Sequence, residues 1–168
     1  MQRMKRVFGI FEVVFDALYL ASAFILGLVL LRTGTGNYSR ILAGVMALVL
    51  AFGDAFHLLP RILVIITHRE EQLRHSLGRG KQITSITMTV FYLFLWEIGK
   101  KHYAINTHTY LSLLVYGLAT LRVLLCFLPQ NCWTKENSPL KWAIIRNIPF
   151  FILGEYSNLF SIVSALHS

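Results

Sequence analysis

The second long apolar segment of this sequence carries an acid, an imidazole and a guanidinium. Asp54, His57 and Arg61 lie within residues 41–67, at a spacing (i, i+3, i+7) that places them on one face of a helix. An ionised side chain near the middle of a bilayer costs roughly 2.5–3.5 kcal/mol on insertion scales, so it needs a partner, a cavity or a use. These three residues are therefore the first candidates for a ligand- or ion-binding site.

Other apolar segments also carry charges. Glu12 and Asp16 share a helix face in the first segment, and Arg122 and Arg146 lie in the last two segments. With a cytoplasmic N-terminus, all of them fall at similar depth, and we expect three carboxylates to face three guanidiniums inside a bundle. The predicted site is formed by the first, second, fourth and fifth segments. Its ligand- or ion-binding residues are Asp54, His57, Arg61, Glu12, Asp16, Arg122 and Arg146.

Composition favours a membrane protein. Hydrophobic residues make up 55% of the 168 positions and charged residues 14%, against about 25% charged in an average soluble domain. The apolar runs predict an all-α, polytopic transmembrane helix bundle that forms a single transmembrane domain over residues 1–168. About five spans are expected, at residues 7–31, 41–67, 83–98, 110–128 and 140–166. A sixth span, missing from this chain, is left open as an alternative.

The basic residues predict the orientation of the bundle. The net charge of +8 could suggest nucleic-acid binding, but most Lys and Arg occupy short connections between apolar runs, so we expect no nucleic-acid partner. More of them lie on the side of the N-terminus (Arg3, Lys5, Arg6, Arg69, Arg74, Arg79, Lys81, Lys135, Lys141) than on the opposite side (Arg32, Arg40, Lys100, Lys101). This asymmetry predicts a cytoplasmic N-terminus in a bacterial cytoplasmic membrane.

Three classes of function fit these residues. The first is a small-solute or ion-handling protein, such as a transporter or a ligand-binding protein; an imidazole changes charge near neutral pH, so His57 makes proton coupling chemically available. Pro60 frees the carbonyl of Phe56 beside His57, as in the broken helices that line transport sites. The second is a membrane-embedded hydrolase with Asp54 and His57 as metal ligands. The third is a structural or regulatory subunit. No metal-binding residues are predicted, and the sequence does not indicate a cofactor. The expected partners are the lipid bilayer and a small solute or ion.

Two family resemblances bear on these alternatives. The runs Phe52–Arg61 (FGDAFHLLPR), Ile86–Tyr92 (ITMTVFY) and Arg146–Phe150 (RNIPF) resemble a set of bacterial multi-pass membrane proteins that carries no activity to transfer. A span with Asp54 and His57 after one with Glu12 and Ser22 is faintly similar to the alkaline ceramidase and adiponectin-receptor group of zinc hydrolases. Those proteins have seven spans and an H-x3-H pair in the last one, which this sequence lacks.

Overall fold

The computed structural model describes residues 2–102, 109–135 and 139–166, with side chains described within 8–101, 109–135 and 139–154 except residue 153. This part of the chain is helical, which confirms the all-α class. Five long helices and one short 3-10 turn follow one another. They are α1 (Gln2–Thr33), α2 (Tyr38–Thr67), α3 (Glu70–His102), α4 (Thr109–Phe127), η1 (Pro129–Asn131) and α5 (Leu140–Leu166).

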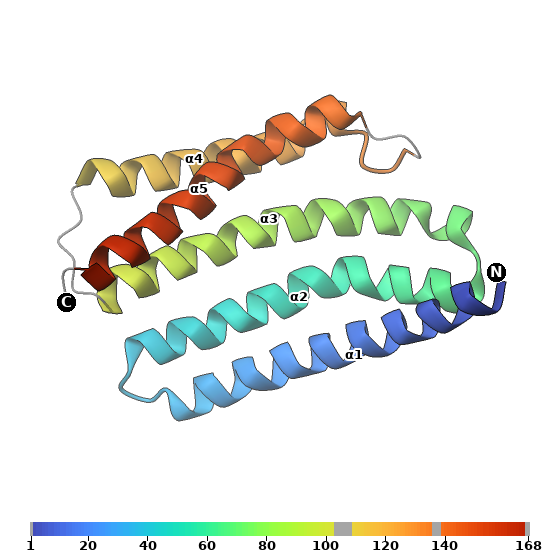
Figure 1. Cartoon of the computed structure of the whole chain (residues 1–168), viewed down its shortest axis with the longest axis horizontal. Helices are drawn as coiled ribbons and strands as arrows, with labels where there is room; N and C mark the ends of the chain where they lie inside the picture. Colours follow the sequence, from blue (N-terminus) through green and yellow to red (C-terminus); the bar gives the residue numbers. More distant parts are fainter. Residues whose placement is uncertain (1, 103–108, 136–138, 167–168) are drawn as a thin grey trace.

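The helices alternate in direction, and α3 occupies the middle of the arrangement (Figure 1). Helices α1, α2 and α3 lie side by side, while α4 and α5 pack together on the other side of α3. The most buried apolar cluster joins α3 to α4 through Trp96, Val115 and Ala119. Because α1 and α2 pack on one side of α3 and α4 and α5 on the other, polar groups on α1 are held apart from those on α4 and α5.

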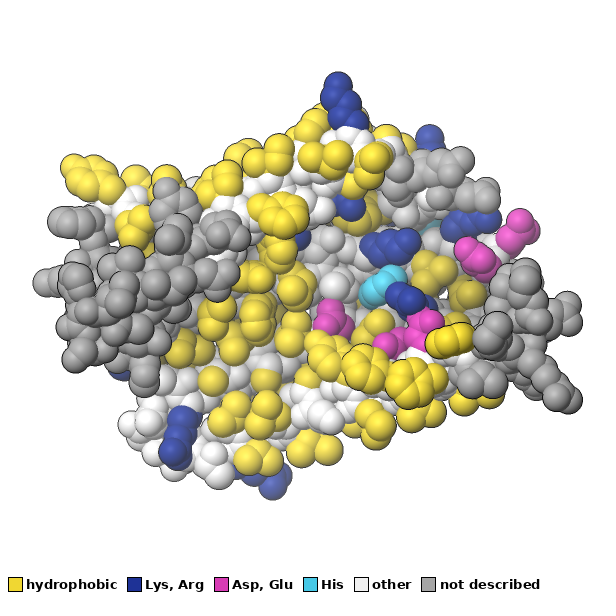
Figure 2. All heavy atoms as spheres, in the orientation of Figure 1, with side chains coloured by type: hydrophobic (Ala, Val, Ile, Leu, Met, Phe, Trp, Pro, Cys, Tyr) yellow, Lys and Arg dark blue, Asp and Glu magenta, His cyan; other side chains and the backbone are white. Residues whose placement is uncertain are grey.

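Within the described residues, three helices are long and apolar enough to cross a membrane. They comprise Phe8–Thr33, Tyr38–Thr67 and Thr109–Phe127. Large apolar side chains on the outer faces of these helices are exposed, among them Phe11, Phe15 and Leu124, and hydrophobic side chains cover much of the face shown in Figure 2. A surface of this kind suits lipid rather than water. The chain is therefore suited to a membrane.

The turn between α2 and α3 is much shorter than the sequence predicted. We expected residues 68–82 to form a loop, but only His68 and Arg69 separate the two helices. His68 ends α2 in the left-handed conformation (φ 56°), and its N–H donates to the Val64 carbonyl at 2.8 Å. The first turns of α3 are rich in charges that stay exposed, such as Glu70 and Glu71, so this stretch lacks an apolar signal although it is helical.

Glycines allow α2 and α3 to approach each other closely. A Cβ atom at Gly80 would overlap the backbone of Phe56 and His57, and one at Gly53 would overlap the Thr87 side chain. The Thr84 hydroxyl donates to the Gly53 carbonyl at 2.9 Å across the same interface. Small residues at such crossings are typical of helix pairs in membranes, where packing replaces the hydrophobic effect. The Gly80 contact brings α3 against His57, and Lys81, the next residue along α3, interacts electrostatically with that imidazole.

Replacing Gly80 with alanine should loosen the α2–α3 pair. The added methyl group meets backbone, which cannot rotate away, so we expect Gly80→Ala to lower the free energy of unfolding by about 1–3 kcal/mol. Gly117→Ala is the matched control, because a Cβ there meets nothing within 4 Å and alanine favours a helix by roughly 0.5–1 kcal/mol. Thermal unfolding in detergent compares the two variants, and equal midpoints would contradict the close approach.

Candidate functional site

The predicted site residues fall into two groups on opposite sides of α3. We call the first the carboxylate cluster; its members lie on α1, α2 and the facing side of α3. They are Glu12, Asp16, Tyr19, Asp54, His57, Arg61 and Lys81. We call the second the arginine cluster; its members lie on α3, η1, α4 and α5. They are Ser85, Thr89, Arg122, Asn131, Arg146 and Asn147.

Two polar contacts join α1 to α2 in the carboxylate cluster. Arg61 Nε forms an ion pair with Glu12 Oε1, and both side chains are partly exposed (49% and 34%). The Tyr19 hydroxyl donates to Asp54 Oδ2 at 2.7 Å. The helical period explains why these contacts can coexist: Glu12, Asp16 and Tyr19 share one face of α1, and Asp54, His57 and Arg61 share one face of α2.

Three buried atoms of the carboxylate cluster have no hydrogen-bond partner within the described residues. One of them, Glu12 Oε1, forms the ion pair with Arg61. The other two are Asp16 Oδ2, on a residue that is only 9% exposed, and His57 Nδ1. His57 interacts electrostatically with Asp16 and Asp54, and also with Arg61 and Lys81. Buried polar atoms usually have partners. An acid and an imidazole that both lack one can exchange a proton or receive a ligand.

The charges of the carboxylate cluster do not balance while His57 is neutral. Glu12, Asp16 and Asp54 carry three negative charges, and Arg61 and Lys81 carry two positive ones. One negative charge is therefore left over, and a single proton on His57 cancels it. Uptake of one positive charge would restore the balance.

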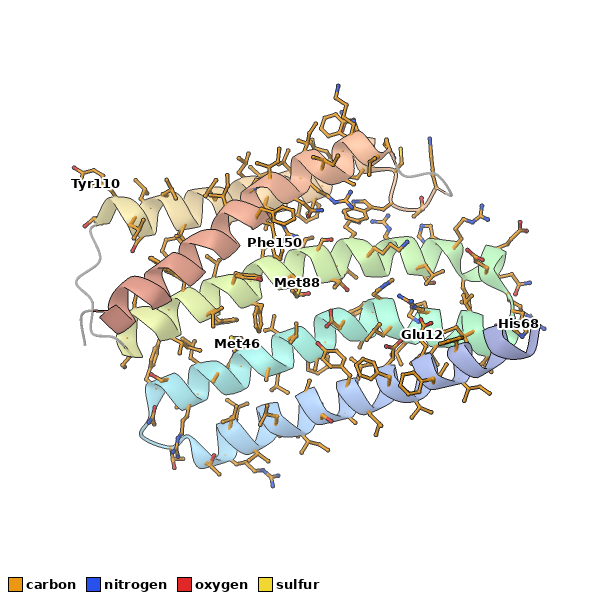
Figure 3. The ribbon with its side chains drawn as sticks, viewed as in Figure 1. Glu12, Met46, His68, Met88, Tyr110 and Phe150 are labelled. Atoms are coloured by element: carbon orange, nitrogen blue, oxygen red, sulfur yellow. The ribbon has the colours of Figure 1, made fainter. Side chains whose placement is uncertain are left out.

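An open pocket of about 500 Å³ at one end of the bundle meets this cluster at Glu12. It lies between α1 and α2, with His68 and Glu70 at the α2–α3 turn and Glu12 further along α1. Figure 3 labels Glu12 and His68 in this region. Acidic, basic and histidine side chains gather among hydrophobic ones on the same half of the molecule (Figure 2). Glu12 is therefore the member of the carboxylate cluster that lines this pocket.

In the arginine cluster, Arg122 is held by neutral groups. Although only 4% exposed, its Nη1 donates to the Ser85 carbonyl and to the Thr89 hydroxyl. Its Nη2 donates to Asn147 Oδ1 at 3.5 Å, and its Cζ lies 4.2 Å from the centre of the Phe150 ring. These contacts connect α4 to α3 and α5, and Phe150 reaches from α5 toward α3 (Figure 3).

Arg146 has a similar environment nearer the end of the bundle. Its Nη1 donates to Asn131 Oδ1 at 3.0 Å, and its Cζ lies 4.0 Å from the centre of the Trp133 ring. Asn131 is 1% exposed and donates to the carbonyls of Leu125 and Leu128 at 2.7 and 2.9 Å. The turn after α4 thus presents an amide oxygen to the guanidinium.

The structure corrects the expected pairing of three carboxylates with three guanidiniums. Arg61 pairs with Glu12, but the described partners of Arg122 and Arg146 are neutral oxygens. The physical reason is the lateral order of the helices, because α3 lies between α4 and α5 on one side and α1 and α2 on the other. Depth alone could not reveal this lateral order, and the predicted residues form two polar clusters rather than one.

Some residues of these clusters were not predicted. Lys81 was assigned to a loop, while Asn131 and Trp133 lie in the connection after α4. Asn147 directly follows Arg146 in the sequence. Its position next to an arginine in an apolar segment could have been used to predict that it belongs to the cluster. The sequence places Tyr19 on the same helix face as Glu12 and Asp16, although Tyr19 was not among the predicted site residues.

The structure gives no support for a metal centre in the part of the chain that it describes. Within those ranges, no group of three or more His, Cys, Asp or Glu side chains lies close enough to hold a metal ion. His102, His108 and His167 lie outside the described side chains. The hydrolase hypothesis therefore stays a prediction.

Comparison with known proteins adds no functional assignment: no protein-family model, curated protein or solved structure matches this chain. The resemblances drawn from the sequence stay predictions. What the chain does has to be argued from the two clusters themselves.

Proposed function

We propose that this chain is a multi-pass protein of the bacterial cytoplasmic membrane, with five spans and a cytoplasmic N-terminus. Besides the three long apolar helices, we count α3 and α5 as spans. The packing supports a count of five, because α3 and α5 lie beside the apolar helices and run antiparallel to their neighbours. The N-terminus, the α2–α3 turn and the α4–α5 connection lie at one end (Figure 1), where most basic residues are found. That end faces the cytoplasm under the positive-inside rule.

Cysteine labelling in intact cells tests this topology. In a Cys132→Ser background, Thr35→Cys between α1 and α2 should react with a membrane-impermeant maleimide added outside. Ser76→Cys near the start of α3 should react only after permeabilisation. Both positions are exposed. The reverse pattern would contradict the cytoplasmic N-terminus, and labelling of both positions from one side would contradict the spans between them.

The proposed activity is the handling of a proton or a small cation at the carboxylate cluster, as part of solute or ion transport. One observation carries it: the cluster has one more negative than positive charge when His57 is neutral, and Asp16 Oδ2 and His57 Nδ1 lack hydrogen-bond partners. Ionisable groups at membrane depth commonly form proton relays and ion paths. The open pocket that is lined by Glu12 supports this proposal, because it places one carboxylate of the cluster beside space for a small cation.

The charge balance suggests how exchange would proceed. With His57 protonated, the cluster is neutral and has no net attraction for a cation. Loss of that proton leaves one negative charge shared by Asp16 and Asp54, and a small cation entering through the pocket restores neutrality. Proton and cation then compete for the same site, which couples the binding of one to the release of the other. Tyr19 holds Asp54 in place through its hydroxyl.

Proteoliposomes containing a pH-sensitive dye test this activity. An inward gradient of Na⁺ or K⁺ should move protons through the parent protein. Asp16→Asn and His57→Ala should reduce the initial rate by about tenfold or more, because a charge-assisted contact is worth about 1.5–3 kcal/mol. Ser22→Ala is the control on the same helix, since Ser22 is exposed and donates only to the Leu18 carbonyl within its own helix.

Two results would contradict the proposed activity. One is proton movement in folded Asp16→Asn and His57→Ala proteins at the rate of the parent. The other is the absence of both proton movement and cation-dependent thermal stabilisation in the parent. If the variants only lower thermal stability while the parent responds to no cation, the cluster serves the structural role of the third hypothesis.

A further inference from the structure

We propose that the arginine cluster binds a phosphate-type oxyanion between Arg122 and Arg146. This inference concerns the side of α3 away from the carboxylate cluster and does not depend on the proposed proton or cation exchange. It begins from charge. Arg122 donates to Asn147, the residue that follows Arg146 on α5, so both guanidiniums belong to one cluster. Among the described residues, their hydrogen-bond partners are neutral oxygens from Ser85, Thr89, Asn147 and Asn131.

The hydrogen-bonding capacity of both guanidiniums is incompletely used. The Nε atoms of Arg122 and Arg146 are buried and lack a hydrogen-bond partner within the described residues. Arg122 is more than nine-tenths buried, so water cannot readily supply what the protein does not. A buried charge that keeps an unused donor is strongly unfavourable unless an anion joins it. Because two such charges belong to one cluster, an anion is the expected counterion.

The chemistry of the two side chains specifies the kind of anion. Arginine binds phosphate and carboxylate through two parallel N–H donors, and Nε supplies one of these in its side-on mode. The Phe150 ring covers one face of the Arg122 guanidinium, and the Trp133 ring covers one face of the Arg146 guanidinium. An anion therefore approaches each guanidinium along its edges, where the N–H groups lie. Two arginines in this arrangement favour an anion with several oxygens, as in a phosphate group.

The position of the cluster suits a phosphate at a membrane surface. Arg122 lies five residues before the end of α4 and Arg146 six residues after the start of α5, about 8–9 Å from the helix ends at 1.5 Å per residue. These ends belong to the half of the bundle that carries the N-terminus (Figure 1). Basic pockets between helices at this depth bind the head groups of anionic lipids.

A groove beside the cluster bears on the source of the phosphate. About 210 Å³ in volume, it lies between α3 and α4, and its lining is mostly apolar, with Leu93, Ala119 and Leu124 among its residues. It reaches Thr89, whose hydroxyl accepts from Arg122. A lipid could place its phosphate at the arginines and part of a chain in this groove, whereas inorganic phosphate needs only the arginines.

The test uses the full chain with two phosphate probes. Thermal stability is measured in nanodiscs of phosphatidylcholine with and without phosphatidylglycerol, and in detergent with inorganic phosphate against chloride at equal ionic strength. We expect at least one phosphate probe to raise the unfolding midpoint of the parent. Arg146→Gln should weaken the apparent affinity for that probe by about tenfold or more. Arg146 serves better than Arg122 because it is only half-buried, so its variant has the better chance of folding.

Lys141→Gln is the matched control, because Lys141 is an exposed cation near the start of the same helix. It should keep the response of the parent if the arginines, rather than general surface charge, bind the anion. A response to phosphatidylglycerol alone identifies a lipid head group, and a response to inorganic phosphate as well identifies a freely accessible oxyanion site. A parent that responds to neither probe, or a folded Arg146→Gln protein that responds as the parent does, overturns the proposal.

Discussion

An ionised side chain between apolar helices needs an opposite charge or a set of polar groups from the protein, because lipid supplies neither. This constraint shapes both polar regions of the chain. On α1 and α2 the requirement is met mainly by opposite charge, with Glu12 paired to Arg61. On α4 and α5 it is met by neutral oxygens and aromatic faces around Arg122 and Arg146. Helix α3 contributes to both and keeps them apart.

The first half of α3 contributes to both regions because of its glycines. Gly80 brings α3 against the backbone of α2 at His57, and Gly78 brings it against the backbone of Trp133 in the α4–α5 connection. Any larger residue at either position would push one of these neighbours away. The two residues that follow Gly80 then interact with different helices. Lys81 interacts electrostatically with His57 on α2, and Gln82 donates to the Cys126 carbonyl on α4. A short stretch of small and polar residues thus contacts both polar clusters.

Periodicity in the sequence was enough to locate the five helices and to group the charges on α1 and α2. The expected span 140–166 coincides with α5, and 110–128 differs from α4 by one residue at each end. The start of α3 was missed because its charged residues and glycines at 78 and 80 resemble a loop, and only packing against α2 makes those glycines useful. The arginines could not be assigned to partners, because residue spacing fixes the face of a helix but not which helix lies beside it.

The separation of the two clusters by α3 is the central claim, and double-mutant cycles test it most directly. In each cycle the free energy of unfolding is measured for two single variants and for their combination. The account predicts that Asp16→Asn and Arg122→Gln are additive within about 0.5 kcal/mol, as for residues that share no partner. Glu12→Gln with Arg61→Gln is the positive reference, with an expected coupling of about 1 kcal/mol or more. A coupling of that size between Asp16 and Arg122 would contradict the separation.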